Sequence, residues 1–325
     1  MAADLLVSVI IPAYNAEDTL AAAIEAVCGQ DAVARVELIV VDDGSTDTTA
    51  DIVRRYPGVV YVHQDNAGPA SARNHGARIA KGSILFFTDS DCSPERSWIS
   101  KMLKGFAHEG VSAVAGSYGI ANTASPLARV IHAEIVFRHR VLMPEFPKAF
   151  GSYNVAIRRA VFEVAGGFNA QYRTASGEDN DLSYRIIARG GRIFFCRGAC
   201  VDHYHQEALP RYLKEQFRHG VWRVKMYADH PGMMAGDGYT FWKDVVEVPV
   251  AAAHLFVFFC PVPVMAMSLG FLFFEVVFGA VIMGPGPEMF FAGYVFWLRS
   301  FMRAAGFFMG CFISFKNTLL NVKKT

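Results

Sequence analysis

The stretch Phe86-Phe87-Thr88-Asp89-Ser90-Asp91 decides the fold class, because it joins an apolar run to a pair of carboxylates. Residues 83–87 form a short run of the kind found in buried β-strands. Side chains at i and i+2 of extended backbone point to the same face, so Asp89 and Asp91 lie together. Like charges repel unless a cation lies between them, and Mg²⁺ is usually held by carboxylates plus substrate phosphates. The pair predicts a metal–diphosphate site, and taken alone it also fits a solvated acidic turn.

Strands and helices alternate around this stretch at short intervals. Expected strands cover 7–12, 36–41 and 59–63, and expected helices cover 17–30, 48–56 and 70–80. This order is typical of right-handed βαβ units, so we expect an α/β fold with a mostly parallel sheet flanked by helices. Ligands of such sheets bind beyond the carboxyl ends of the strands, where Tyr14-Asn15, Asp42-Asp43 and Asp89-Asp91 would converge.

Two further segments each have two interpretations. Glu178, Asp179 and Asp181 lie in the first turn of an amphipathic helix, where they serve either a catalytic role or simple capping of the helix dipole. Residues 209–226 interleave basic and aromatic side chains. They form either an interfacial helix on anionic lipid or a surface helix packed on the domain.

The C-terminal part is strongly apolar. Spanning a bilayer takes about 20 apolar residues. Residues 255–283 and 289–315 are both longer than that and are joined by a turn at 284–287. We expect a transmembrane hairpin whose flanking lysines lie in the cytoplasm, rather than a buried soluble helix pair. Glu275, within the first span, is expected to pair with Arg299 or Arg303 of the second.

Composition supports this division and excludes some partners. The 325 residues carry a net charge of +1, which gives no electrostatic case for nucleic acid. The mean hydropathy is +0.25, with the apolar excess after about residue 248. Six cysteines show no disulfide framework or zinc set, and we expect buried, reduced thiols. The first residues lack the pattern of a signal peptide.

These patterns divide the chain into three expected parts. Residues 1–207 form a catalytic domain, residues 208–247 an interfacial helical region, and residues 248–325 two membrane helices and a tail. We therefore expect the protein in the inner or plasma membrane, with its catalytic domain in the cytoplasm.

Five motifs follow one another in a fixed order. They are Val9-Ile10-Ile11-Pro12-Ala13-Tyr14-Asn15, Val40-Val41-Asp42-Asp43-Gly44-Ser45, Asn66-Ala67-Gly68 with Ala72-Arg73-Asn74, Asp89-Ser90-Asp91 and Gly177-Glu178-Asp179. This pattern resembles family 2 glycosyltransferases, which are inverting enzymes with the GT-A (Rossmann-like) fold. The resemblance covers roughly residues 7–205.

The resemblance implies a site for a nucleotide-diphosphate sugar, with UDP favoured as the nucleotide. The implied donor-binding residues are Pro12, Ala13, Tyr14, Asn15, Asp42, Asp43, Asn66, Gly68, Arg73, Asp89 and Ser90. Either Asp42 or Asp43 would accept a hydrogen bond from the base. Arg73 would lie near the diphosphate, and Asp89 would contact ribose or sugar hydroxyls.

The resemblance also implies the catalytic roles. Asp91, with Asp89, would bind a divalent cation, Mn²⁺ or Mg²⁺. His203 would be a further ligand, with His205 as the competing candidate, and a histidine ligand favours Mn²⁺. Asp179 would be the catalytic base, and Glu178 beside it would hold the acceptor.

The chemistry suits these residue types. Breaking a sugar–phosphate bond builds negative charge on the departing diphosphate, which a divalent metal neutralises. The acceptor hydroxyl is a poor nucleophile, so a carboxylate must take its proton. A carboxylate with an ordinary pKa near ~4 is ionised at neutral pH and suits that role.

Three functions follow from these residues. The first is inverting transfer of a sugar to a lipid-linked or glycan acceptor, with membrane lipids as further partners. The second is a metal-dependent nucleotidyltransferase, which would need a glycine- and lysine-rich loop where Pro12-Ala13-Tyr14-Asn15 stands. The third is a catalytically silent membrane scaffold, against which Asp89, Asp91 and Asp179 argue.

Overall fold

The computed structural model describes residues 5–31, 34–172, 174, 177–233, 242–254 and 261–322. The chain divides into two units. Unit 1 comprises residues 1–121 and 143–204, and unit 2 comprises residues 122–142 and 205–325. Residues 122–142, expected within the catalytic domain, therefore group with the C-terminal helices.

Unit 1 holds all the strands of the described chain. They are β1 (Leu6–Ala13), β2 (Arg35–Asp42), β3 (Val59–His63), β4 (Ile84–Thr88), β5 (Cys92–Pro94), β6 (Val111–Ile120), β7 (Asn154–Arg158) and β8 (Arg192–His203). Its helices are α1 (Leu20–Cys28), α2 (Thr49–Arg54), α3 (Pro69–Ile79), α4 (Trp98–Gly105), α6 (Arg159–Ala165) and α7 (Glu178–Ala188).

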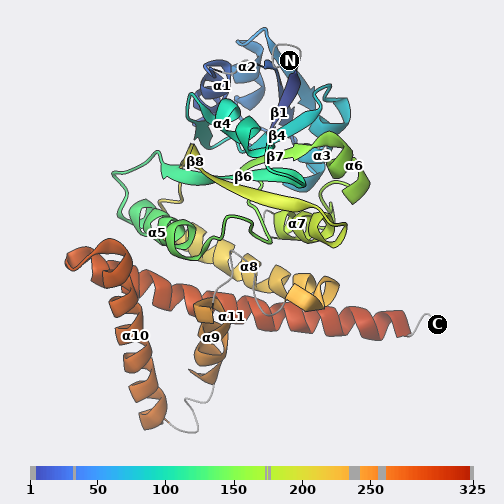
Figure 1. The fold of residues 1–325 in the computed structure, drawn as a ribbon. Coiled ribbons are helices and arrows are strands. Elements are labelled where there is room, and N and C mark those ends of the chain that lie inside the picture. Colours follow the sequence, from blue (N-terminus) through green and yellow to red (C-terminus); the bar gives the residue numbers. More distant parts are fainter. Residues whose placement is uncertain are drawn as a thin grey trace. The chain divides into compact units, whose positions relative to one another are not determined.

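The strands form one sheet in the order β3-β2-β1-β4-β7-β6-β8-β5 (Figure 1). The half built from β1, β2, β3 and β4 is parallel, as the βαβ pattern predicts. In the other half β7 runs antiparallel to both β4 and β6, and β5 runs antiparallel to β8. The fold class is confirmed as α/β, with a mixed second half that the sequence pattern did not specify.

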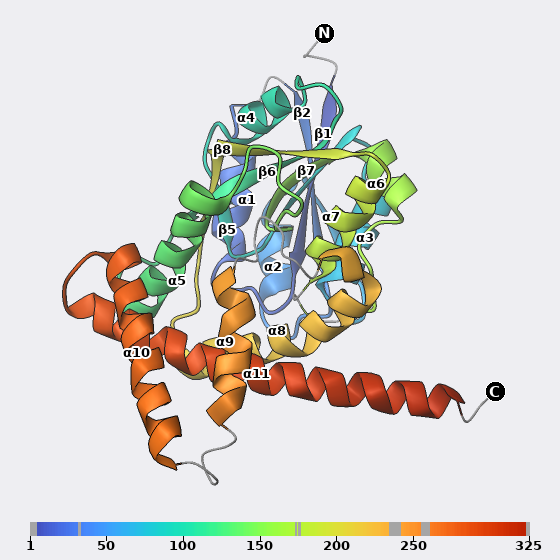
Figure 2. The same ribbon diagram turned by 60° about the horizontal axis from the view of Figure 1, so that its bottom comes forward.

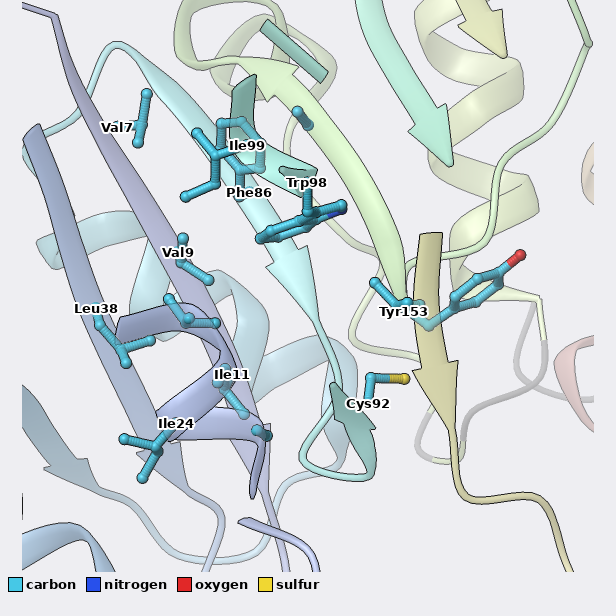
Figure 3. Packing of buried hydrophobic residues seen from close by; sticks show 14 of the residues in the cluster. Val7, Val9, Ile11, Ile24, Leu38, Phe86, Cys92, Trp98, Ile99 and Tyr153 are labelled. Atoms are coloured by element: carbon cyan, nitrogen blue, oxygen red, sulfur yellow. The ribbon is translucent and has the colours of Figure 1, made fainter. Parts of the chain in front are cut away.

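Successive residues of β4 pack against helices on opposite faces of the sheet. The Phe86 ring lies 5.1 Å from the ring of Trp98 in α4. Phe87, one residue on, lies 5.4 Å from Phe162 in α6. Figure 3 shows Phe86 and Trp98 with Val9 and other core residues. Burial on both faces explains why this strand is a continuous apolar run.

Unit 2 is helical in its described part. It contains α5 (Pro126–Phe137), a π-helical turn (Arg138–Leu142), α8 (Leu209–Asp229), a 3₁₀ turn (Pro231–Met233), α9 (Trp242–Ala253), α10 (Pro261–Met283) and α11 (Pro287–Val322). The predicted turn between the apolar segments is present before Pro287, with Gly284 at φ +83°. Figures 1 and 2 show α8 lying alongside α11.

One of the two predicted membrane spans is supported. Among the described helices, Val262–Met283 is long and apolar enough to cross a membrane, with a mean hydropathy of 2.1. The second expected span lies within α11, which does not meet that condition and carries Arg299 and Arg303 near its middle. The hairpin is therefore supported for its first helix only.

Buried charged and polar side chains join α11 to the helices packed against it. The fully buried Arg299 guanidinium donates to Glu134 of α5, and its Nη2 lies 3.1 Å from Glu247 Oε1 of α9. Arg303 Nε donates to Gln216 of α8 at 2.8 Å. Glu275 is also fully buried. Its predicted pairing with Arg299 or Arg303 stays a prediction.

Unit 2 buries polar side chains beside its apolar core and exposes many large apolar ones. Buried polar residues include Glu134, Gln216, Glu247, Glu275, Arg299 and Ser300. The exposed large apolar residues of α10 and α11 include Val262, Met265, Leu269, Phe273, Val277, Val281, Phe290, Phe308, Met309, Phe312 and Phe315. Exposed apolar surface of this extent marks an interaction with a protein or a membrane.

Candidate active site

The carboxyl ends of β1 and β2 are joined by the motif residues that follow them. In parallel pairing Pro12 lies opposite Val41 and Ala13 opposite Asp42, and Asp43 N–H donates to the Ala13 carbonyl at 2.8 Å. Asn15 has a positive φ of 48°. Its N–H donates to Ser45 Oγ at 2.9 Å, and its Oδ1 accepts from Thr46 N–H at 2.8 Å. The Tyr14 side chain beside it is 53% exposed and accessible to a ligand.

Asp42 is buried and has partners for both carboxylate oxygens. Oδ1 accepts from Ser45 N–H at 2.8 Å, and Oδ2 accepts from the Tyr61 hydroxyl at 2.8 Å. Burial, followed by this hydrogen bond, raises the pKa of Tyr61 to about 12. The hydroxyl therefore keeps its proton and remains the donor at neutral pH.

Asp43 holds the loop that carries the third motif. Its Oδ1 accepts from Ala67 N–H at 2.9 Å and from Gln64 Nε2 at 2.6 Å. Its Oδ2 accepts from Gly68 N–H at 2.8 Å. Asn66 is exposed in the same loop, and Gly68 leads into α3. Asp43 thus ties the loop of residues 64–68 to the end of β2.

Arg73 links two acidic motifs from within the protein. Its side chain is 2% exposed, with Nη2 2.6 Å from Asp89 Oδ1 and Nη1 3.0 Å from Glu178 Oε1. The guanidinium also lies over the Phe168 ring at 5.5 Å. Burial acts to lower the pKa of Arg73, but the two carboxylates outweigh it and raise that pKa. Both Nη groups of the residue expected near the diphosphate therefore contact protein carboxylates.

Asp179 lies in the first turn of α7, next to Glu178 of this cluster. Burial is the main cause that raises the pKa of Asp179 to about 7, and the neighbouring charge of Glu178 adds to it. Hydrogen bonds from the Asn180 and Ser152 N–H groups, and the charge of Arg73, act in the opposite direction. A base whose pKa lies near the working pH is well matched to proton transfer. This differs from the ordinary carboxylate that the sequence alone suggests.

Asp91 and His203 lie together although 111 positions separate them in the sequence. The antiparallel pairing of β5 with β8 places Cys92 opposite His203, and His203 Nε2 is 3.3 Å from Asp91 Oδ2. In the part of the chain that the structure describes, Asp91, Cys92 and His203 form a group whose ligand atoms lie within 4.8 Å of one another. His205 lies in unit 2, its ring 5.6 Å from that of His132.

A divalent cation fits between the Asp91 carboxylate and the His203 imidazole. One oxygen and one nitrogen 3.3 Å apart are spaced as two ligands of a single ion. Burial acts to raise the pKa of Asp91, but His203 and nearby hydrogen bonds outweigh it, so the pKa is lowered and the carboxylate stays ionised. Asp89 contacts Arg73. Ser90 lies between the two acids and is partly buried.

Asn154 is a positioning residue that the sequence analysis missed. It is buried, accepts from Trp98 Nε1 at 2.7 Å, and donates to the Ser117 and Ala199 carbonyls at 2.9 and 3.0 Å. These bonds join β7 to β6 and β8 at the register shift after Gly116. These bonds thereby hold in place β8, the strand that ends at His203. Nothing in the local sequence signals this, because its partners come from distant segments.

Several known proteins resemble this chain in sequence. The chain is 28% identical over 239 residues to the pre-mycofactocin glycosyltransferase of Mycobacterium tuberculosis, covering 70% of this chain and 49% of that protein. It is 27% identical over 235 residues to glycosyltransferase AglE of Haloferax volcanii, covering 68% of this chain and 74% of that protein. The chain therefore spans about half the length of the Mycobacterium protein, which has further sequence beyond the match.

Solved structures share the architecture. A mannosyltransferase from Pyrobaculum calidifontis, in complex with GDP-Man and Mn²⁺, matches with a TM-score of 0.60 at 20% identity, covering 92% of this chain and 86% of that one. This likeness confirms the expected fold of glycosyltransferase structures. The model for "Glycosyl transferase family 2" matches residues 8–174, just over half of the 325 residues. The chain belongs to glycosyl transferase family 2.

Proposed function

We propose that this protein transfers a sugar, with inversion, from a nucleotide-diphosphate sugar to an acceptor, using a divalent cation. The observation that carries the proposal is that unit 1 contains two acidic groups with different neighbours. Asp91 lies with His203, whereas Asp179 lies with Glu178 and Arg73. An inverting transfer needs one site for the diphosphate and one base for the acceptor.

The base is Asp179. It takes the proton from the acceptor hydroxyl as that oxygen attacks the anomeric carbon from the face opposite the diphosphate. Ser152 and Asn180 N–H groups stabilise its ionised form, and burial favours its protonated form. The carboxylate therefore accepts a proton readily near neutral pH. Glu178, buried and paired with Arg73, stays beside it and orients the acceptor side of the site.

Asp91 and His203 would hold the cation, Mn²⁺ or Mg²⁺, which when bound would neutralise the charge that develops on the leaving diphosphate. The imidazole ligand favours Mn²⁺, the ion that accompanies GDP-Man in the Pyrobaculum calidifontis protein. Tyr14 is exposed for stacking on the base. Asp42 or Asp43 accepts from the base, Asn66 and Gly68 line the same edge, and Asp89 contacts sugar hydroxyls. UDP is the first nucleotide to test, followed by GDP and dTDP.

We propose that unit 2 attaches the enzyme to a membrane. Only 17% of the apolar window of Val262–Met283 is buried in the protein, so most of this helix offers apolar surface to a solvent. Water is a poor solvent for such surface and lipid a good one. We infer an inner- or plasma-membrane protein with unit 1 in the cytoplasm. A lipid-linked or membrane-associated glycan is the matching acceptor.

Nucleotide binding tests this function directly. The detergent-solubilised protein is heated with UDP, GDP or dTDP, each with and without Mn²⁺, beside Asp91→Asn and the surface control Asp51→Asn. Ligand at ~100 times its dissociation constant adds about 2.7 kcal/mol of stability. We expect one nucleotide to stabilise only with metal, and Asp91→Asn alone to abolish the shift. Stabilisation by none would contradict the proposal and favour a silent scaffold. Release of pyrophosphate from a nucleoside triphosphate would favour a nucleotidyltransferase.

A further inference from the structure

Cys92 lies in the same cluster as the proposed cation ligands and directly follows the acidic pair Asp89 and Asp91 in the sequence, although its surroundings show no cysteine-based zinc motif. Cys92 and His203 are opposite residues of the antiparallel pair β5–β8, so their side chains share one face of the sheet. Cys92 Sγ lies 3.7 Å from Asp91 Oδ1. The three potential ligand atoms thus come from one turn and one neighbouring strand.

Two distances between potential ligand atoms can be compared with those of a tetrahedral zinc site. With bonds of about 2.0 Å to nitrogen or oxygen and about 2.3 Å to sulfur, tetrahedral angles give edges of about 3.3 Å between nitrogen and oxygen and about 3.5 Å between sulfur and oxygen. The protein has 3.3 Å between His203 Nε2 and Asp91 Oδ2, and 3.7 Å between Cys92 Sγ and Asp91 Oδ1. Each distance is close to a zinc value and ends on a different oxygen of Asp91, and one ligand atom from each of the three residues lies within 4.8 Å of the other two.

The accessibility of the three side chains leaves one side of such a site open. Cys92 is fully buried, whereas the side chains of His203 and Asp91 are 20% and 41% exposed. An ion approaching from solvent would meet the oxygen and nitrogen first and the sulfur on its inner side. The outer position stays available for water or a phosphate oxygen, as in three-ligand zinc sites.

We propose that Asp91, Cys92 and His203 form a site for a thiophilic divalent ion, Zn²⁺ in the first place. Sulfur ligands select soft or borderline ions, whereas Mg²⁺ and Mn²⁺ prefer oxygen. On binding, the Cys92 thiol loses its proton to solvent, and a carboxylate and a thiolate then balance the charge of the ion. If the proposed function is correct, Zn²⁺ competes with the catalytic cation and inhibits transfer.

Cadmium absorption spectroscopy tests the site without relying on activity. Cd²⁺ bound to a thiolate has an ultraviolet charge-transfer band, which it lacks when bound only by oxygen and nitrogen. The full-length protein in detergent is titrated with Cd²⁺ beside Cys92→Ser, Cys92→Ala and the control Cys28→Ser, which removes an exposed thiol. We expect the band in the parent and in Cys28→Ser, and its loss in both Cys92 variants.

Zinc affinity provides the second measurement, by competition with a chromophoric chelator. Cys92→Ser should weaken Zn²⁺ binding at least tenfold and leave Mn²⁺ binding unchanged within about twofold, because oxygen replaces sulfur at constant size. A band that persists in both Cys92 variants, or unaltered zinc affinity, overturns the proposal. An inactive protein that keeps the Cys92-dependent band would refute the proposed transferase function and leave the metal site standing.

Discussion

The proposed base, Asp179, lies in a buried setting that raises its pKa and makes its ionised form less favourable in the folded protein. Its pKa of about 7 means that it is partly protonated at neutral pH in the free protein. The activity of the free enzyme, kcat/KM, should therefore fall as the pH drops through this value. Asp179→Asn should keep nucleotide binding and lose about 10²–10⁴-fold in turnover, since only the proton acceptor is removed. Near-normal turnover of this variant would remove Asp179 from the role.

The neighbours of Asp179 should shift the acid limb of the kcat/KM pH profile in opposite directions. Glu178 raises the pKa of Asp179 and Arg73 lowers it. Glu178→Gln should thus move the acid limb of the kcat/KM profile to lower pH, and Arg73→Gln should move it to higher pH. A merely structural defect would lower the rate at every pH without moving the limb, so the pH profile separates the two. Equal shifts in one direction would contradict the electrostatic account.

The same pKa has a consequence for stability. The carboxyl ionises near its ordinary value in the unfolded chain and near 7 in the folded one, so the folded state binds more protons between these values. Its contribution to the free energy of unfolding therefore falls as pH rises from about 4 to about 7. Asp179→Asn should stabilise the protein at pH 8 relative to pH 5 by about 1–3 kcal/mol. Thermal melts at both pH values measure this, and an equal effect at the two would contradict it.

At the scale of elements, a glycine of α11 allows α8 and α11 to pack closely. A Cβ on Gly306 of α11 would overlap the Phe217 carbonyl oxygen of α8, whereas one on Gly270 of α10 would meet nothing within 4 Å. Gly306→Ala should therefore cost about 1–3 kcal/mol by overpacking. Gly270→Ala should be neutral or stabilising by about 0.5–1 kcal/mol, because alanine is the better helix former. Melting temperatures in detergent compare the pair, and equal effects would show that the helices do not pack here.

At the scale of the whole molecule, the exposed apolar side chains of unit 2 predict which surface meets lipid. Leu269 and Phe273 are 63% and 70% exposed on one face of α10, and Val164 of unit 1 is 70% exposed. Lysine at the centre of a membrane helix costs about 2.5–3.5 kcal/mol. The double variant Leu269→Lys/Phe273→Lys should lose most of its recovery in the membrane fraction, and Val164→Lys should not. Unchanged recovery of the double variant after an alkaline wash would show that this face does not meet lipid.

Much of the fold could be predicted from local pattern. The strand Ile84–Thr88 is buried throughout and apolar up to Thr88 because both of its faces are covered, and the βαβ order makes the first half of the sheet parallel. The turn at Gly284 and the apolar helix after Pro261 also follow from neighbouring residues. These features depend on contacts within a few positions or on the period of hydrophobic residues, which sequence displays directly.

Other features depend on which distant segments meet, and only the tertiary structure decided them. Pairing of β5 with β8 brings Cys92 next to His203. Cys92 therefore shares a candidate ion site with Asp91 and His203, although no zinc motif surrounds it in the sequence. The burial of Arg73 between Asp89 and Glu178, and the raised pKa of Asp179, arise from desolvation by residues far apart in the chain. Sequence by itself determined the strands, helices and motif residues. The protonation of the motif residues, their ion pairs and their grouping into a candidate ion site were set by long-range packing, because burial and Coulomb energy depend on distances in space.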